Sequence, residues 1–173
     1  MLTIDIKRGS ASQIRADVLL ILHSQGSPFS SNQFLTKTDA DLDHTLTELL
    51  KQDQFVGKAN ESVLLPSLGR ANAGKILVMG LGEKTKLDTD AYRKLGAQLA
   101  KRAKNLKAKH VVIVWPDVAV TGASVRDLSE AFAEGIWLGS YVFHEYKGRI
   151  HEAQNKEKQE VERITIINHD RTK

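Results

Sequence analysis

The string GRANAGKI, at residues 69–76, nearly matches a phosphate-binding loop of the form GxxxxGK[ST]. In such a loop, backbone N–H groups and the lysine hold phosphate oxygens, and the final hydroxyl binds Mg²⁺. The final position here is Ile76, and Lys75 begins an apolar run that is typical of a strand, not a helix. We therefore interpret the string as the turn of a β-hairpin around Gly69 and Gly74, and not as a site of nucleotide hydrolysis.

Gly80, Leu81 and Gly82 stand between a predicted strand and a predicted helix, which is the context of a dinucleotide-binding loop. The third glycine of that motif is missing, because position 85 is Thr85. Two glycines alone carry little information, so we interpret them as the exit from the strand.

Side chains that bind metals or act as nucleophiles are present but form no known pattern. The six histidines show neither an i, i+4 pair nor an HExxH motif, and the chain has no cysteine and no GxSxG. Asp39, Asp41 and Asp43 have the spacing of the first half of a calcium loop, but the required glycine and closing glutamate are missing. The sequence therefore indicates no catalytic residue, no metal ligand and no cofactor site in this chain.

Positive charge is concentrated in one segment. The formal net charge is +4, and residues 84–109 contain nine Lys or Arg against two Asp. Lys94, Lys101 and Lys104 fall on one side of the helix predicted there, opposite its apolar side. Such a face is either simply solvated or contacts a polyanion such as DNA. The lack of interleaved aromatic residues weakens the second interpretation.

Length and composition are typical of one soluble domain. A chain of 173 residues is large enough to bury a core without disulfides or metals. The absence of cysteine suits a reducing compartment, and the N-terminus lacks the apolar stretch of a signal peptide. No apolar run approaches the ~20 residues of a membrane span. We expect a cytoplasmic protein without membrane contact.

Apolar runs predict six strands, at residues 2–6, 17–22, 62–66, 75–80, 110–115 and 163–168. Continuous runs such as DVLLIL and HVVIVW are typical of strands covered on both faces. The short connection between the third and fourth strands predicts an antiparallel pair.

Helical spacing appears at residues 41–50, 89–107 and 124–147. Asp39 or Asp41 is suited to cap the first of these helices, and Asp88 or Thr89 the second. Strands interleaved with helices predict an α/β fold: a mixed, mostly parallel sheet with helices on both faces.

The helix predicted at residues 124–147 has two apolar faces. Its main stripe consists of Leu128, Ala131, Phe132, Gly135, Leu138, Gly139, Val142 and Phe143. Glycine costs about 1 kcal/mol relative to alanine inside a helix, so Gly135 and Gly139 predict a close approach of another backbone. Trp137 and Tyr141 lie one turn apart outside the stripe. They predict a covering surface: the sheet, a further domain or another subunit.

Five blocks of the sequence resemble, in the same order, the N-terminal non-catalytic domain of the leucine (cytosol) aminopeptidase family. They are residues 17–22, 74–82 (GKILVMGLG), 92–107, 110–116 and 131–147 (AFAEGIWLGSYVFHEYK). The resemblance covers nearly the whole chain. It implies a three-layer fold similar to a macro domain, as a single domain over residues 1–173. Within it, the charged residues 149–160 are expected to form a mobile linker before the last strand.

In that family a larger catalytic domain follows, which holds two divalent metal ions (zinc or manganese), and the enzyme assembles as a hexamer. The family's catalytic motifs, NTDAEGRL and FDSGG, do not occur here. The resemblance therefore implies a structural and oligomerisation domain of a leucyl aminopeptidase. Its partners would be its own catalytic domain and further copies, and the domain alone would hydrolyse nothing.

Two other functions stay open. Some bacterial members of the family bind DNA, which the basic face at Lys94, Lys101 and Lys104 permits. Macro domains bind ADP-ribose through asparagines at a strand end and a glycine-rich loop. The comparable string here, HSQGSP at residues 23–28, lacks the asparagines. Nucleotide binding of that kind is therefore the less favoured alternative.

Overall fold

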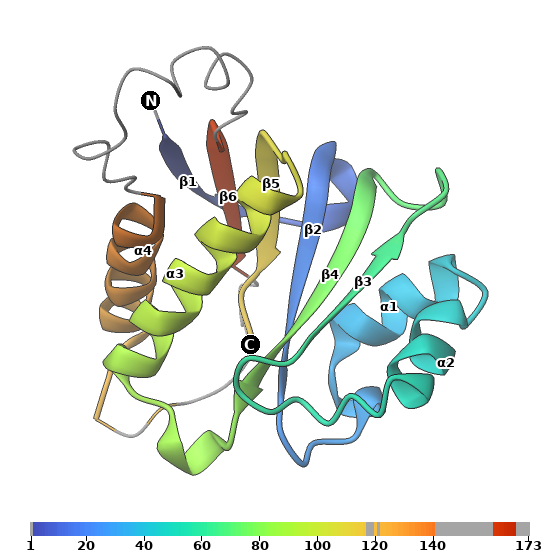
Figure 1. Cartoon of the computed structure of the whole chain (residues 1–173), viewed down its shortest axis with the longest axis horizontal. Coiled ribbons are helices and arrows are strands. Elements are labelled where there is room, and N and C mark those ends of the chain that lie inside the picture. The colour runs from blue at the N-terminus through green and yellow to red at the C-terminus, as the bar shows by residue number, and fades with distance from the viewer. Residues whose placement is uncertain (1, 117–119, 121, 141–160, 169–173) are drawn as a thin grey trace, which may run out of the picture.

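A six-stranded sheet lies between two pairs of helices (Figure 1). The computed structural model describes residues 2–116, 120, 122–140 and 161–168. The strands are β1 (Thr3–Arg8), β2 (Ala16–Ser24), β3 (Ser62–Pro66), β4 (Ala73–Gly82), β5 (His110–Val114) and β6 (Arg163–Asn168). The α-helices are α1 (Gln33–Asp41), α2 (Thr45–Gln52), α3 (Thr89–Asn105) and α4 (Val125–Ser140). Helices α3 and α4 cover one face of the sheet, and α1 and α2 cover the other, so the predicted three-layer α/β class is confirmed.

The strand order is β1-β6-β5-β2-β4-β3, and only β3 runs antiparallel to its neighbour. Strand β2 has partners on both edges and helices over both faces. Val18 and Leu20 belong to the core under α3 and α4, whereas Leu19 and Ile21 belong to the core on the opposite face. A strand in this position has no solvated side, which explains its continuous apolar sequence.

Helix α1 is one element that the sequence pattern did not predict. It buries only three residues: Leu35, Thr38 and Asp39. Asn32 begins it, because its Oδ1 accepts hydrogen bonds from the N–H groups of Phe34 and Leu35, each at 3.2 Å. The Nδ2 of Asn32 donates to the carbonyl oxygen of Leu22, at 2.9 Å. One polar side chain thus starts α1 and ties it to the end of β2.

Asp39 caps the next helix, α2. Its Oδ1 accepts the N–H of Thr47 at 2.7 Å, and its Oδ2 accepts the Thr47 hydroxyl at 2.6 Å. The Nδ1 of His44 lies 3.1 Å from Oδ2. Burial by itself would raise the pKa of Asp39, but the hydrogen bonds from Thr47 and His44 outweigh it, and the pKa is lowered. Of the two caps that the sequence allowed, the structure selects Asp39 and leaves Asp41 exposed.

The backbones of α3 and α4 are almost in contact. A Cβ atom added at Gly135 would lie 1.9 Å from the carbonyl oxygen of Arg93. At Gly139 and Gly96 it would meet a carbonyl oxygen of the opposite helix at 2.6 and 2.2 Å. No other residue allows such a separation without moving one helix. The close approach predicted at Gly135 and Gly139 is confirmed.

The prediction that Leu138 belongs to the buried stripe of α4 is wrong. Leu138 is 66% exposed, and Ile136 is fully buried in its place. The contact with α3 is centred on Gly135 and Gly139, and this rotates the helix so that Ile136 turns inward. Val142, Phe143 and the expected linker at residues 149–160 lie outside the described residues.

We expect Gly135→Ala to lower the free energy of unfolding by about 1–3 kcal/mol, because the added methyl group must displace the Arg93 carbonyl. The loss should appear despite a gain in helix propensity of about 1 kcal/mol. Urea unfolding measures it. Leu138→Ala, on the exposed side of the same helix, is the control and should change stability by about 0.5 kcal/mol or less. Equal effects of the two variants would contradict the close contact.

Asp39→Ala should cost about 1–3 kcal/mol at neutral pH, because it leaves the N–H and hydroxyl of Thr47 without their acceptor. A lowered pKa in the folded state adds stability above the ordinary value of 3.8, and this is lost as the pH falls through the folded value. The stabilities of the variant and the parent should therefore converge in acid, measured by urea unfolding at several pH values. Asp41→Ala is the matched control, and an equal loss there would refute the cap.

Candidate functional site

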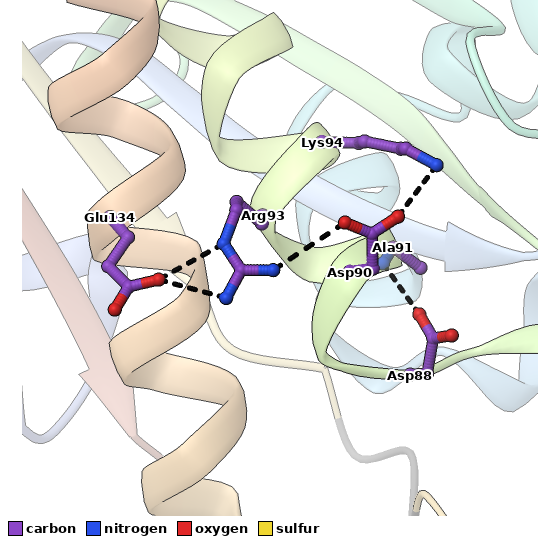
Figure 2. Close-up of polar contacts among 6 residues, drawn as sticks. All are labelled: Asp88, Asp90, Ala91, Arg93, Lys94 and Glu134. Atoms are coloured by element: carbon purple, nitrogen blue, oxygen red, sulfur yellow. Dashed lines mark hydrogen bonds and ion pairs between the residues drawn. The ribbon is translucent and has the colours of Figure 1, made fainter.

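The basic face predicted on α3 is partly neutralised by ion pairs (Figure 2). The Nζ of Lys94 lies 2.7 Å from Asp90, one turn earlier on the helix. Arg93 lies 3.5 Å from Asp90 and donates two hydrogen bonds to Glu134 of α4, at 3.0 and 2.9 Å. The hydrogen bond to Asp90, and then its charge, raise the pKa of Lys94. The first turns of α3 therefore present little uncompensated positive charge.

Lys101 and Lys104, in the last turns of α3, have different surroundings. Lys101 is exposed and Lys104 is half-buried, and neither is within ion-pair distance of a carboxylate in the described part of the chain. Arg102 and Lys107 add two more positive charges nearby. Cations at this end of a helix offset the negative pole of its dipole. The three lysines predicted as one face are thus divided into a paired residue, Lys94, and two without carboxylate partners.

Two exposed apolar side chains stand next to each other near the end of α4. Trp137 is 57% exposed and Leu138 is 66% exposed. Tyr141, which the sequence grouped with Trp137, lies outside the described residues. Large aromatic side chains of this kind act as anchors in protein interfaces. The predicted second apolar face is therefore present at Trp137, where neither the sheet nor α3 covers it.

A cleft of about 310 Å³ opens at the carboxyl ends of β2 and β5, where open α/β sheets bind their ligands. His23 lines it and is buried, with its ring centre 5.1 Å from that of Phe29. Its Nε2 lies 3.0 Å from the carbonyl oxygen of Ser27. Burial lowers the pKa of His23, so its ring is neutral near pH 7. Lys84 also lines this cleft and contributes a positive charge to it.

The backbone N–H groups of the glycines at the end of β4 are already used in hydrogen bonds within the protein. The N–H groups of Gly80 and Gly82 donate to the carbonyl oxygens of Glu61 and Gly57, at 3.0 and 2.9 Å. A Cβ atom on Gly80 would lie 2.0 Å from the carbonyl oxygen of Lys58. The segment before β3 therefore lies directly against this end of β4. These amides do not form a phosphate loop, and the interpretation of the two glycines as a strand exit is confirmed.

Within the described ranges, no group of three or more His, Cys, Asp or Glu side chains could hold a metal ion. The same residues contain no helix long and apolar enough to cross a membrane.

The profile of the "Cytosol aminopeptidase family, N-terminal domain" matches residues 19–149 of the chain. The chain belongs to the cytosol aminopeptidase family. The match runs from β2 beyond the end of α4, and so includes α3 and its contact with α4. The expected family, and the expected place of this chain as its N-terminal domain, are confirmed.

Relatives in the cytosol aminopeptidase family are much longer than this chain. A probable cytosol aminopeptidase of Alkaliphilus oremlandii is 33% identical over 144 residues, which are 83% of this chain and 28% of the relative. One from Aquifex aeolicus is 32% identical over 114 residues, which are 66% of this chain and 22% of the relative. The chain thus spans about a quarter of the length of these aminopeptidases.

Solved structures show the same fold. A tomato leucine aminopeptidase mutant superposes with a TM-score of 0.75 at 24% identity, over 97% of this chain and 32% of that one. A Trypanosoma brucei macrodomain in complex with ADP superposes with a TM-score of 0.63 at 12% identity, over 97% of this chain and 64% of that one. The macro-domain-like architecture expected from the family is therefore confirmed.

Proposed function

We propose that this chain is the non-catalytic part of a larger, metal-dependent aminopeptidase that removes leucine and other N-terminal residues from peptides. The family match and the much longer relatives support this proposal. The described residues do not fit a metal centre, because their carboxylates and histidines do not cluster. The two divalent metals of the family would therefore belong to the catalytic domain. The role of this domain is to hold that catalytic domain in position and to support assembly into a homo-oligomer, a hexamer in the family.

The exposed pair Trp137 and Leu138 carries the proposal that α4 contacts the catalytic domain. The pair stands on a rigid support, because the glycine contacts with α3 and the Arg93–Glu134 ion pair fix the helix. An indole with over half its surface in water, beside an exposed leucine, gains free energy when a partner covers it. A rigid aromatic anchor also loses little conformational entropy on binding.

Acrylamide should quench one of the two tryptophans of the isolated chain, because Trp137 is 57% exposed and Trp115 only 6%. Trp137→Phe should remove the accessible component. In the whole aminopeptidase the proposal predicts that Trp137 is protected and that Leu138→Ser restores part of the quenching. Val125→Ser, at the exposed start of α4, is the matched control and should have no effect. Equal quenching of Trp137 in the isolated chain and the whole protein would overturn this docking surface.

DNA binding is a second candidate function, favoured by the cations without carboxylate partners near the end of α3. Lys101 and Lys104, with Arg102 and Lys107, form a short positive segment that no described carboxylate offsets within 4 Å. Phosphate contacts of this kind give an affinity that falls steeply with salt. Lys94 would contribute less, because it is bound to Asp90.

If the chain binds DNA through this segment, Lys101→Gln should lower the slope of log affinity against log salt by about 0.9, the value for one phosphate contact. Lys94→Gln removes the same charge from the same helix and should change the slope much less. Fluorescence anisotropy with a labelled duplex at several salt concentrations measures both slopes. Equal changes in the two variants, or no binding by the parent chain, would exclude this function for the segment.

A further inference from the structure

One cavity among the described residues lies on the face of the sheet that carries α1. Its volume is about 670 Å³. The side chains of Leu19, Val112 and Val114, from β2 and β5, form its floor. One wall is α1, the opposite wall is the connection from β1 to β2, and the turn between β3 and β4 closes one end. Four segments distant in sequence thus surround one hollow.

Six of the residues that line the hollow are glycine or alanine, which leave space between the larger side chains. Gly9, Ala11, Ala16, Gly69, Ala71 and Ala73 all line it. Protein interiors are otherwise packed as densely as organic crystals. A volume of this size lies in the range of small-molecule sites, which are mostly apolar with a few polar groups. The cavity is therefore better explained as a binding site than as a packing fault.

The rim of the cavity is positively charged. Arg8, Lys37 and Arg70 line it, against one acid, Asp41. The Nζ of Lys37 on α1 lies 3.5 Å from the hydroxyl of Ser10 on the opposite wall, so this ammonium group spans the opening. No carboxylate in the described part of the chain pairs with Lys37.

Arg70 adds a second cation at the end of the cavity. Its Nη1 contacts Asp43, which does not line the cavity. A guanidinium has five N–H donors, so this contact leaves donors for a further anion. Positive groups at the rim and an apolar floor together favour a ligand with an acid group at one end and an apolar body at the other.

We propose that this cavity binds a small organic anion with an aromatic or aliphatic body. Lys37 and Arg70 hold its acid group, and the half-buried side chains of Phe34 and Ile14 contact its body. The site lies on the face opposite to α3 and α4, so it does not depend on the proposed docking of a catalytic domain. Its failure would leave that proposal unaffected.

The probe for this site is 8-anilinonaphthalene-1-sulfonate, an aromatic anion whose fluorescence rises in apolar surroundings. The uncharged N-phenyl-1-naphthylamine has the same rings without the sulfonate. Titration of the full chain should show one site that binds the sulfonate about tenfold more tightly than the neutral probe, as a charge-assisted contact predicts. Because such probes also bind loosely packed states, near-UV circular dichroism must show an intact aromatic core in every variant.

Lys37→Met keeps the length of the side chain but removes its charge, and should weaken sulfonate binding about tenfold without affecting the neutral probe. Lys37→Arg should restore most of the affinity. Lys51→Met removes one charge from the neighbouring helix α2, outside the cavity, and is the matched control. Ala71→Trp and Ala73→Phe should each reduce the binding of both probes, because they place bulk in the cavity.

Unchanged sulfonate binding in both bulky variants would place the probe elsewhere and overturn the site. Equal affinity of the two probes, or equal effects of Lys37→Met and Lys51→Met, would overturn its preference for anions. The absence of sulfonate binding by the parent chain would overturn the proposal altogether.

Discussion

The contact of α3 with α4 without intervening side chains is the constraint on which one whole face of the protein depends. Gly96, Gly135 and Gly139 remove the atoms that would keep the two helices apart. Their approach brings Glu134 to Arg93, turns Ile136 into the core and leaves Trp137 in solvent. The pairing of Arg93 on α3 with Glu134 and the exposure of Trp137 on α4 therefore both follow from the close approach of the two helices. A larger distance between α3 and α4 would alter both the ion pair and the exposed surface.

Much of the fold was predictable because local sequence and tertiary environment agree. The strands buried on both faces are continuous apolar runs, and the turn of the hairpin before β4 contains Gly69, whose positive φ favours glycine. Helix α1 was missed because it buries few apolar residues, and its start depends on Asn32 reaching back to Leu22. Leu138 was misplaced because a period of 3.6 residues fixes the width of a stripe but not the rotation of the helix against its partner.

The candidate sites were less predictable than the fold, since the pairing and exposure of their side chains depend on the folded surface. Spacing placed Lys94 with Lys101 and Lys104, but ion pairs on the folded surface separate them. The sequence does contain a signal for Trp137, because this apolar residue falls outside the main apolar stripe of its helix. The anion cavity left no such signal, because residues from segments distant in sequence surround it only after the chain has folded.

The strand order affects how this domain folds during its synthesis. Among the six described strands, β1 comes first in the sequence, yet it lies at the edge of the sheet and pairs in parallel with β6, the sixth. Thr3 pairs with Arg163, so the ladder between β1 and β6 cannot form before Arg163 has been synthesised. Contacts between residues so distant in sequence slow folding, because the loop between them must close first. During synthesis the sheet would stay open between β5 and β1 until its last strand emerges, a period in which nascent-chain chaperones have an unpaired edge to protect.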